Sequence, residues 1–434
     1  MDGIVIIGGG AAAAAVIKSK PDAKVTVIMA NEYLEWALAC TYALANPNEY
    51  MRFVSPNKST FEHRNATYVY DMVTSVNVEE KKLSCASGRE IPYGALIVAS
   101  GYKLPIINAK PGTPLPKRIA EIEHWGSKIA AAETVVINGA GAIGLELACD
   151  IKIHHPSKRV VVLSRSGNIF SGAYPDSVLA TFQREVKRIG VEVLKGTISG
   201  ADGGTEPLDT PGVLQLSDGS WPTLAYDVFL PAFMQGVNTE FLPSDMLTEG
   251  AGAKLVRVNE YLQSVDRPEI FAVALNDSGE GFSLPLIAEQ AKSVAKNAAR
   301  LVKGEPLVPY QPNKKISALN WHLRPAIVKL GYGPGGFASV DNIPACPDTA
   351  CITCLGFPFC IPPCCWPCCG GAKAAFAFGT CCSKAEGQGT MAWYLACFGV
   401  GGVKVFPKAM ADMKGFGEAP KGGGPPSNDE MKRK

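Results

Sequence analysis

Six residues, Gly-Ala-Gly-Ala-Ile-Gly at positions 139–144, restrict the fold of this chain more than any other feature of its sequence. They follow the β-branched run 134–137 and precede a run that favours a helix, so strand, turn and helix are predicted in that order. In such a turn Gly139 makes the bend, Gly141 lets the backbone approach a pyrophosphate, and Gly144 lets the helix pack against the strand. The helix N-terminus then faces the anion. This spacing predicts a βαβ unit of the kind that binds a dinucleotide.

A related turn stands near the start of the chain, at residues 8–13. Gly8, Gly10 and Ala13 satisfy the pattern Gly-x-Gly-x-x-Ala between an apolar strand-like run and the β-branched run 25–28. We call it the first glycine turn, and the later one the second glycine turn. Together they predict an α/β protein with two Rossmann-like dinucleotide-binding domains, each built on a parallel sheet.

The strand after each glycine turn ends where a carboxylate usually holds the ribose of an adenine nucleotide. After the first turn this position is Met29, whose thioether is a weak acceptor, and Glu32 could replace it only if the loop folds back. After the second turn stand Ser164 and Arg165. Arginine suits the 2′-phosphate of NADP, so the second unit is predicted to hold NADP or else no cofactor tightly.

Two further segments complete the α/β pattern. Residues 95–98 form a buried strand that ends in the small residues Ala99, Ser100 and Gly101, which we call the 99–101 turn. Residues 286–302 carry alanines at helical spacing and predict a helix that ends near a glycine.

In this order the motifs resemble those of the FAD-dependent pyridine-nucleotide oxidoreductases, and among them the apoptosis-inducing-factor-like and ferroptosis-suppressor-like quinone reductases. The resemblance extends over residues 3–340. It is carried by both glycine turns, by the 99–101 turn, and by the segments 31–36, 237–242, 269–273 and 288–297.

The resemblance implies a glutathione-reductase-like arrangement, in which an NAD(P)-binding-type domain interrupts an FAD-binding-type domain. A small C-terminal unit, a cysteine-rich apolar segment and a flexible tail are expected to follow. The expected boundaries are 1–118 and 246–305 for the FAD-type domain, 119–245 for the NAD(P)-type domain, 306–345 for the C-terminal unit, 346–405 for the cysteine-rich segment and 406–434 for the tail.

The activity that the resemblance implies is reduction of a bound FAD by NAD(P)H and transfer of the electrons to a quinone-like acceptor. Glu146 matches the acidic residue that such enzymes keep near the nicotinamide, and an ordinary helix-surface glutamate is the alternative. Lys103 follows the 99–101 turn, either as an electrostatic partner at the flavin edge or as a solvated loop lysine. Disulfide-reductase activity is excluded because Cys40 stands alone where that chemistry needs a cysteine pair.

The chain departs from the family pattern at the flavin site. After the strand 270–273 the family has Gly-Asp, whereas this chain has Ala274 and Leu275, and Asp277 comes two positions late. Together with Met29, these changes weaken the flavin site at both ends. The alternative function is therefore a catalytically degenerate relative that serves as an accessory or scaffold subunit of a membrane-bound respiratory or photosynthetic electron-transfer complex.

The chain has 14 cysteines, and eleven of them lie in the segment 346–397. Two CxxC pairs, Cys351 with Cys354 and Cys365 with Cys368, have the spacing of a zinc site, and an iron–sulfur cluster is a second possibility. The same segment is apolar and carries few charges, which equally favours contact with a membrane or another subunit. Disulfides rank third, because the sequence indicates a reducing compartment.

Charge and hydropathy exclude other partners. The 42 lysines and arginines nearly balance the 40 aspartates and glutamates, so no basic surface for nucleic acid is expected. Strand-like sequence begins at Gly3, so no targeting peptide is expected before it. The uncharged run 349–372 is long enough to span a bilayer, but four prolines interrupt it, so no membrane-spanning helix is predicted there. We expect a membrane-associated protein, either in an organelle (mitochondrion or chloroplast) or on a cytoplasmic face.

Overall fold

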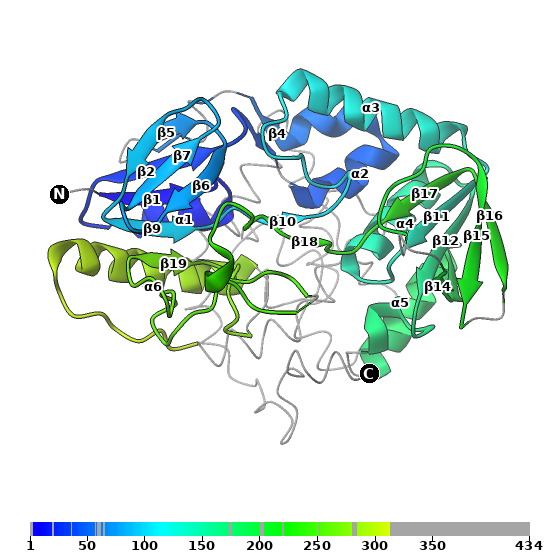
Figure 1. Ribbon diagram of the computed structural model, residues 1–434. Coiled ribbons are helices and arrows are strands. Elements are labelled where there is room, and N and C mark those ends of the chain that lie inside the picture. Colours follow the sequence, from blue (N-terminus) through cyan, green and yellow to red (C-terminus); the bar gives the residue numbers. More distant parts are fainter. Residues whose placement is uncertain are drawn as a thin grey trace, which may run out of the picture.

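The computed structural model describes residues 3–312, except for 20, 36, 57, 59–61, 64–65, 173–175, 200–203, 219–220, 251 and 280–283. Two parallel sheets, each with helices on one face and antiparallel strands on the other, form the centre of the fold and lie on opposite sides of the molecule (Figure 1). The predicted α/β fold with parallel sheets is confirmed. The predicted units at 306–345, 346–405 and 406–434 lie wholly or almost wholly outside the described residues.

The first sheet has the strand order β19-β9-β1-β2-β5, and all of its strands are parallel. Strands β1, β2, β9 and β19 are almost wholly buried, which is why they read as continuous apolar runs in the sequence, whereas the edge strand β5 is partly exposed. Helices α1 and α6 cover one face, and the antiparallel strands β6, β7 and β8 pack on the other. The bounds are β1 Ile4–Ile7, α1 Ala11–Lys18, β2 Val25–Met29, β5 Ala66–Tyr70, β6 Val73–Asn77, β7 Lys82–Cys85, β8 Glu90–Pro92, β9 Ala95–Val98, β19 Ile270–Ala272 and α6 Leu284–Lys303.

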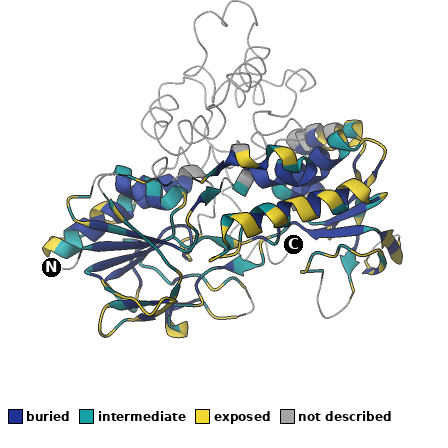
Figure 2. Ribbon diagram, turned by 90° about the horizontal axis from the view of Figure 1, so that it is seen from above, coloured by how far each residue is buried: buried dark blue, intermediate teal, exposed yellow. Residues whose placement is uncertain are grey.

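The second sheet has the order β13-β12-β11-β17 and is again parallel. Helices α3, α4 and α5 pack with one of its faces, and the antiparallel strands β14, β15 and β16 cover the other. In Figure 2 the strands of both sheets are largely buried, and exposed residues lie on the outer faces of helices and on loops. The bounds are α3 Leu115–Ala131, β11 Thr134–Asn138, α4 Ala142–His154, β12 Arg159–Ser164, α5 Asp176–Ile189, β13 Glu192–Lys195, β14 Thr197–Ile198, β15 Gly212–Ser217, β16 Thr223–Tyr226 and β17 Val228–Pro231.

The segment between β2 and β5 packs with the second sheet although it belongs to the first in sequence. Its elements are β3 Leu34–Glu35, η1 Ala37–Ala39, α2 Cys40–Ala45, η2 Pro47–Phe53 and β4 Val54–Ser55. Buried residues of α2 share one apolar cluster with α3, α4 and the second sheet, and α2 lies below α3 beside α4 in Figure 1. The Nε2 atom of His155, which follows α4, lies 3.2 Å from the carbonyl oxygen of Ala45. The predicted boundary at residue 118 falls inside α3, and the division into domains stays a prediction.

Two chain crossings connect the sheets. The first runs from the 99–101 turn through β10 (Tyr102–Lys103) to α3, and the second returns through β18 (Gly236–Val237). β10 and β18 pair antiparallel, so the two crossings support each other. Among the helices of the described residues, none has both the length and the apolar character needed to cross a bilayer.

Candidate functional site

The first glycine turn lies at the carboxyl end of β1 and has the close backbone approach that the sequence predicts. Gly8 has φ +107°, donates its N–H to the carbonyl of Ile28 at 2.8 Å, and leaves no room for a Cβ because the carbonyl oxygen of Ala99 occupies that space. Gly10 precedes the first residue of α1, and a Cβ built on it would meet nothing within 4 Å. The free space and the helix N-terminus form a cradle suited to a pyrophosphate.

The 99–101 turn stands beside the first glycine turn, because β9 is the parallel neighbour of β1. Gly101 has φ +82° and also faces open space. The hydroxyl of Ser100 donates to the carbonyl of Asn238, and the side-chain amide of Asn238 donates to the carbonyl of Ser100 at 3.0 Å. This reciprocal pair of hydrogen bonds joins the 99–101 turn to the second chain crossing.

At the carboxyl end of β2, Met29 occupies the place of the expected carboxylate. Its side chain is buried and packs so closely over Gly9 that a Cβ on Gly9 would overlap it. Glu32 is exposed and pairs with Lys58 at 3.3 Å, and the Lys58 ammonium lies 3.9 Å from the centre of the Tyr70 ring. A carboxylate is therefore present at this edge of the sheet, but it is solvated and held by a lysine.

The loop after β19 differs from the family pattern in its contacts as well as its sequence. Ala274 takes φ +64°, in the left-handed region that favours the glycine of the family, and donates its N–H to Gln290 at 2.8 Å. Leu275 turns into the apolar cluster between β9 and the β6–β8 strands. The exposed Asp277 accepts a 2.9 Å hydrogen bond from the N–H of Val258. In this structure the Asp277 carboxylate stabilises its own loop through this hydrogen bond. A role of Asp277 in flavin binding stays a prediction.

These contacts decide how far the chain fits an FAD. The first glycine turn and the 99–101 turn offer the backbone groups and the open space that a flavin dinucleotide pyrophosphate needs. At the two ends, the positions of the family carboxylates hold the buried apolar side chains of Met29 and Leu275. The backbone at the centre of the site therefore fits the FAD pyrophosphate. Binding of the ribose and of the ribityl chain must come from groups other than Met29 and Leu275.

The second glycine turn has the predicted order of strand, tight turn and helix, between β11 and α4. Gly139 has φ +123° and donates its N–H to the carbonyl of Leu163 at 3.1 Å. A Cβ on Gly144 would overlap the carbonyl oxygen of Gly139, so α4 packs on the turn as closely as a glycine permits. Gly141 precedes α4 and faces open space. The turn can accept a nucleotide pyrophosphate at the N-terminus of α4.

The end of β12 presents an arginine rather than a carboxylate. Ser164 is buried and donates its hydroxyl to the carbonyl of Asn168 at 2.6 Å, so this hydroxyl supports the loop. Arg165 is exposed. The loop returns to the second glycine turn, where the N–H of Phe170 donates to the carbonyl of Ala140 at 2.8 Å. Arg165 thus begins a loop that borders the nucleotide turn.

The two predicted catalytic residues lie in different surroundings. Glu146 is a buried residue of α4, two positions after Gly144, so the alternative of an ordinary helix-surface glutamate is wrong. Lys103 lies on β10, where its exposed ammonium forms an ion pair with the exposed Glu240 of the second crossing. Both roles stay predictions, and the Lys103 pair also links the two crossings.

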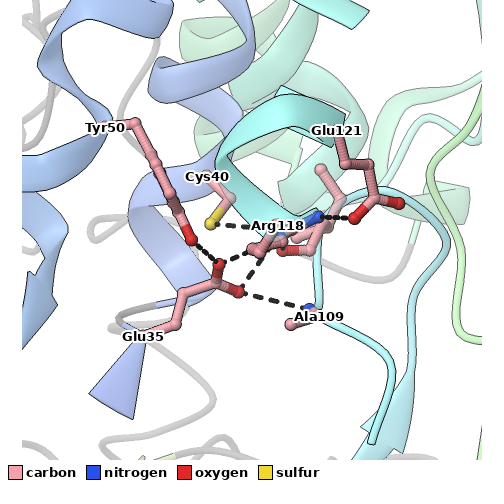
Figure 3. Close-up of polar contacts among 7 residues, drawn as sticks. Glu35, Cys40, Tyr50, Ala109, Arg118 and Glu121 are labelled. Carbon is pink, nitrogen blue, oxygen red and sulfur yellow. Dashed lines mark hydrogen bonds and ion pairs between the residues drawn. The ribbon is translucent and has the colours of Figure 1, made fainter. Parts of the chain in front are cut away.

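A buried polar cluster escaped the sequence analysis. The guanidinium of Arg118 in α3 is completely buried and donates from Nε to Glu35 at 2.8 Å and from Nη1 to Glu121 at 2.8 Å (Figure 3). Glu35 also accepts a 2.5 Å hydrogen bond from the hydroxyl of Tyr50. We call Glu35, Cys40, Tyr50, Arg118 and Glu121 the Glu35–Arg118 cluster. Arg118 and Glu121 have the i,i+3 spacing of an ion pair on a helix, but no fixed spacing joins them to Glu35, Cys40 or Tyr50.

Burial sets the ionisation of this cluster. It raises the pKa of the Cys40 thiol well above its ordinary value, and the nearby Glu35 carboxylate acts in the same direction. Burial followed by the charge of Glu35 raises the pKa of Tyr50 as well. Cys40 is therefore a buried thiol that lies 3.8 Å from Nη2 of Arg118. The raised pKa keeps this thiol protonated at neutral pH, and a protonated thiol is a weaker nucleophile than a thiolate.

Metal binding was predicted for the cysteine-rich segment. Cys351, Cys354, Cys365 and Cys368 all lie outside the described residues, so the zinc or iron–sulfur site stays a prediction. Within the described part of the chain, no group of three or more His, Cys, Asp or Glu side chains is arranged to hold a metal ion.

Comparison with known proteins agrees with this geometry. Residues 2–274 match the pyridine nucleotide-disulphide oxidoreductase family. One similar curated protein is the FAD-dependent oxidoreductase FVFD30 of Flammulina velutipes, which is 27% identical over 58% of this chain and 77% of that protein. A nitric oxide reductase FlRd-NAD(+) reductase of Klebsiella pneumoniae is 26% identical over 74% of this chain and 85% of the relative. Ferroptosis suppressor protein 1 of Xenopus tropicalis is 22% identical over 59% of this chain and 68% of that protein.

A solved ferredoxin reductase from Rhodopseudomonas palustris has a similar fold. It is 23% identical, has a TM-score of 0.52, and aligns with 71% of this chain and 77% of its own. The assignment to the apoptosis-inducing-factor-like or ferroptosis-suppressor-like branch stays a prediction, since other branches match as well. The family itself is established by a match over more than half of the chain. The chain belongs to the pyridine nucleotide-disulphide oxidoreductase family of FAD-dependent NAD(P)H oxidoreductases.

Proposed function

We propose that this protein is an FAD-dependent NAD(P)H oxidoreductase that reduces a quinone-like acceptor at a membrane surface. One observation carries the cofactor part of the proposal: both glycine turns keep an open backbone cradle at the carboxyl ends of two parallel sheets. In open α/β sheets this edge is where nucleotides bind. The named FAD-dependent and NAD(+)-dependent relatives support the same pair of cofactors.

The chain's own groups would divide the work as follows. The second glycine turn and the N-terminus of α4 would bind the pyrophosphate of NAD(P)H, and Arg165 would pair with a 2′-phosphate. The first glycine turn and the 99–101 turn would bind the pyrophosphate of FAD. When bound, the flavin supplies hydride and electron transfer between nicotinamide and acceptor. In the net reaction, NAD(P)H loses two electrons and one proton, and a quinone gains two electrons and two protons, the second proton coming from solvent.

The acceptor is tested by steady-state kinetics with a soluble quinone. We expect purified full-length protein supplied with FAD to oxidise NADPH in a quinone-dependent reaction that forms one quinol for each NADPH consumed. Substitution of Gly141 by alanine should lower this activity, because a Cβ there enters the space of the pyrophosphate. Absence of quinone-dependent oxidation from a protein that binds both cofactors would refute the quinone assignment while leaving the oxidoreductase assignment intact.

Arg165 gives a prediction about the nicotinamide cofactor. Replacing Arg165 by glutamine should weaken NADPH binding by about tenfold to a hundredfold and leave NADH binding nearly unchanged, since a charge-assisted hydrogen bond contributes about 1.5–3 kcal/mol. Isothermal titration with NADP⁺ and NAD⁺ measures both affinities. The matched control is Arg159→Gln, which removes an arginine at the other end of β12 that pairs with Glu192. Equal loss of both affinities in the Arg165 variant would contradict the assignment.

The membrane part of the proposal depends on the cysteine-rich segment 346–405. Between residues 349 and 407 the charged residues are Lys373, Lys384, Glu386 and Lys404, so the sequence of this segment carries few charges for its length. We expect full-length protein to float with liposomes and a chain that ends at residue 345 to remain unbound. Equal flotation of the two proteins would remove the segment as the attachment site.

The competing function is that of a degenerate accessory or scaffold subunit. It is favoured by the burial of Met29 over Gly9 and of Leu275 in an apolar cluster, which leaves both family carboxylate positions without a polar group. Under this alternative the chain should retain no flavin at saturating FAD and still associate with a membrane protein complex.

A further inference from the structure

The loop that leaves the 99–101 turn has a backbone that an isolated chain would avoid. Ile106 has φ +57°, and a β-branched residue in this region is a genuine outlier. The N–H of Ile107 donates to the carbonyl of Pro105 at 2.7 Å, so Ile106 is the central residue of a three-residue γ-turn. Such a conformation persists only where surrounding contacts over-determine it, and it points to a functional constraint.

Apolar burial explains only part of this turn. The side chains of Leu104, Ile106 and Ile107 all enter the apolar cluster that includes α2, α3 and the second sheet. The left-handed residue allows the consecutive Ile106 and Ile107 to bury their side chains in the same cluster. Burial of this kind would tolerate small shifts of the loop along the surface of α3, so it does not by itself define one position.

Directed contacts to the backbone come from the Glu35–Arg118 cluster. Nη2 of Arg118 donates to the carbonyl of Ile107 at 2.8 Å, and Glu35 accepts the N–H of Ala109 at 3.2 Å. The ion pair thus contacts the chain directly after the γ-turn, at two peptide groups only two residues apart. Asn108 lies between them and closes the loop with a 2.8 Å hydrogen bond from its side-chain amide to the carbonyl of Tyr102.

The ion pair is itself rigidly placed. Arg118 is 0% exposed and the Glu35 side chain is 8% exposed, and the guanidinium contacts Glu35 through both Nε and Nη2. The hydroxyl of Tyr50 in η2 completes the coordination of the carboxylate (Figure 3). A buried ion pair gives little net stability over an apolar replacement, so the feature of this pair that bears on the loop is its contact with the two backbone groups at Ile107 and Ala109.

The position of this loop matters because it is part of the first crossing between the sheets. It follows the 99–101 turn at the first sheet and leads into α3, which packs with the second sheet. β10, at the start of the crossing, pairs with β18 of the second crossing. A displacement of the loop therefore changes where one glycine turn lies relative to the other.

We infer that Glu35 and Arg118 are positioning residues, whose ion pair holds the strained 104–109 loop and thereby sets the distance between the two nucleotide sites for hydride transfer. This inference rests on the proposed function. Hydride transfer requires reacting atoms at about 3–3.5 Å, and a misplacement of about 1 Å lowers the rate by about a hundredfold. Neither residue touches the reacting groups; both act through the loop backbone.

The test compares Glu35→Gln with the matched control Glu121→Gln in the full chain. Glu35→Gln keeps the size of the side chain but removes the charge that holds Arg118, whereas the control removes the partly exposed outer partner of the same arginine. For Glu35→Gln we expect amide hydrogen exchange in peptides covering 102–109 to accelerate about tenfold. The rate of flavin reduction by NADPH should fall about tenfold to a hundredfold, while the Kd for NADP⁺ changes less than about twofold. The control Glu121→Gln should leave the hydrogen exchange at 102–109, the rate of flavin reduction and the Kd for NADP⁺ unchanged.

Tyr50→Phe provides a second variant in case Glu35→Gln does not fold, because it removes only one hydrogen bond to the carboxylate. Tyr50→Phe should also accelerate exchange at 102–109 and slow flavin reduction with little change in the Kd for NADP⁺, but both effects should be smaller than in Glu35→Gln. Unchanged exchange at 102–109 in the variant that folds would overturn the inference, and so would exchange that rises over the whole chain together with a loss of NADP⁺ affinity. If the native protein retains no flavin, the proposed function fails, and the exchange measurement still decides whether the ion pair holds the loop.

Discussion

Replacing Gly144 by alanine is expected to lower the free energy of unfolding by about 3 kcal/mol or more, at the upper end of the cost of overpacking a core. A Cβ at this position would overlap the carbonyl oxygen of Gly139, which is backbone and cannot rotate away. Helix α4 must then move off the strand, and α4 also contacts α2 and α5 in the shared apolar cluster. Chemical denaturation of the variant beside the native chain measures this loss.

Gly141→Ala is the matched control, because it adds the same methyl group three residues earlier. Gly141 has φ −83° and faces open space, so alanine fits the backbone and should change the stability by less than about 0.5 kcal/mol. Its methyl group, however, enters the space that a pyrophosphate would occupy, and NADP⁺ affinity should fall by about tenfold to a hundredfold. The two glycines therefore separate stability from nucleotide binding. Equal destabilisation by both alanines would show that α4 does not pack on the turn in this way.

Arg118→Met should destabilise the protein by about 3–5 kcal/mol, because it leaves the buried Glu35 without its counter-charge. The loss includes the hydrogen bond to the carbonyl of Ile107, which would lose its donor inside the apolar cluster. The double variant Glu35→Leu with Arg118→Met should recover the part of this loss that comes from the unpaired charge, while the Ile107 carbonyl still lacks its donor. Thermal and denaturant unfolding of the single and double variants measure the coupling between the two residues.

The matched control for Arg118→Met is Arg159→Met. Arg159 contacts Glu192 through two nitrogen atoms, with a shortest distance of 2.8 Å, much as Arg118 contacts Glu35. Both Arg159 and Glu192 are largely exposed, and exposed ion pairs contribute at most about 1 kcal/mol. If both methionine variants lose similar stability, burial is not what makes the Glu35–Arg118 pair important.

Local sequence patterns predicted the sheets and the turns because the responsible interactions are local. The spacing of the glycines in each turn, followed by a helix, specifies a strand–turn–helix unit regardless of the rest of the chain. The predicted strands at 25–28, 95–98 and 134–137 and the predicted helix at 286–302 match β2, β9, β11 and α6. The two βαβ units at the glycine turns indicated that both sheets would be parallel.

The parts that escaped prediction depend on contacts between distant residues. Helix α2 is short and its apolar residues fit either sheet, so only tertiary packing places it against α4. The pairing of Glu35 with Arg118 joins positions 83 residues apart, and each residue alone reads as an ordinary surface charge. The strain at Ile106 has no sequence signal, because isoleucine does not favour a positive φ. At the flavin site, the sequence identified the departures at Met29 and Leu275, and the structure added that both side chains are buried.

The central claim, that this chain carries electrons from NAD(P)H through a flavin, is tested most directly by an anaerobic absorption titration of full-length protein loaded with FAD. We predict a protein-bound flavin band after removal of free FAD, and its loss on addition of about one equivalent of NADPH per flavin. Protein that retains no flavin at saturating FAD, or flavin that neither NADPH nor NADH reduces, would contradict the account.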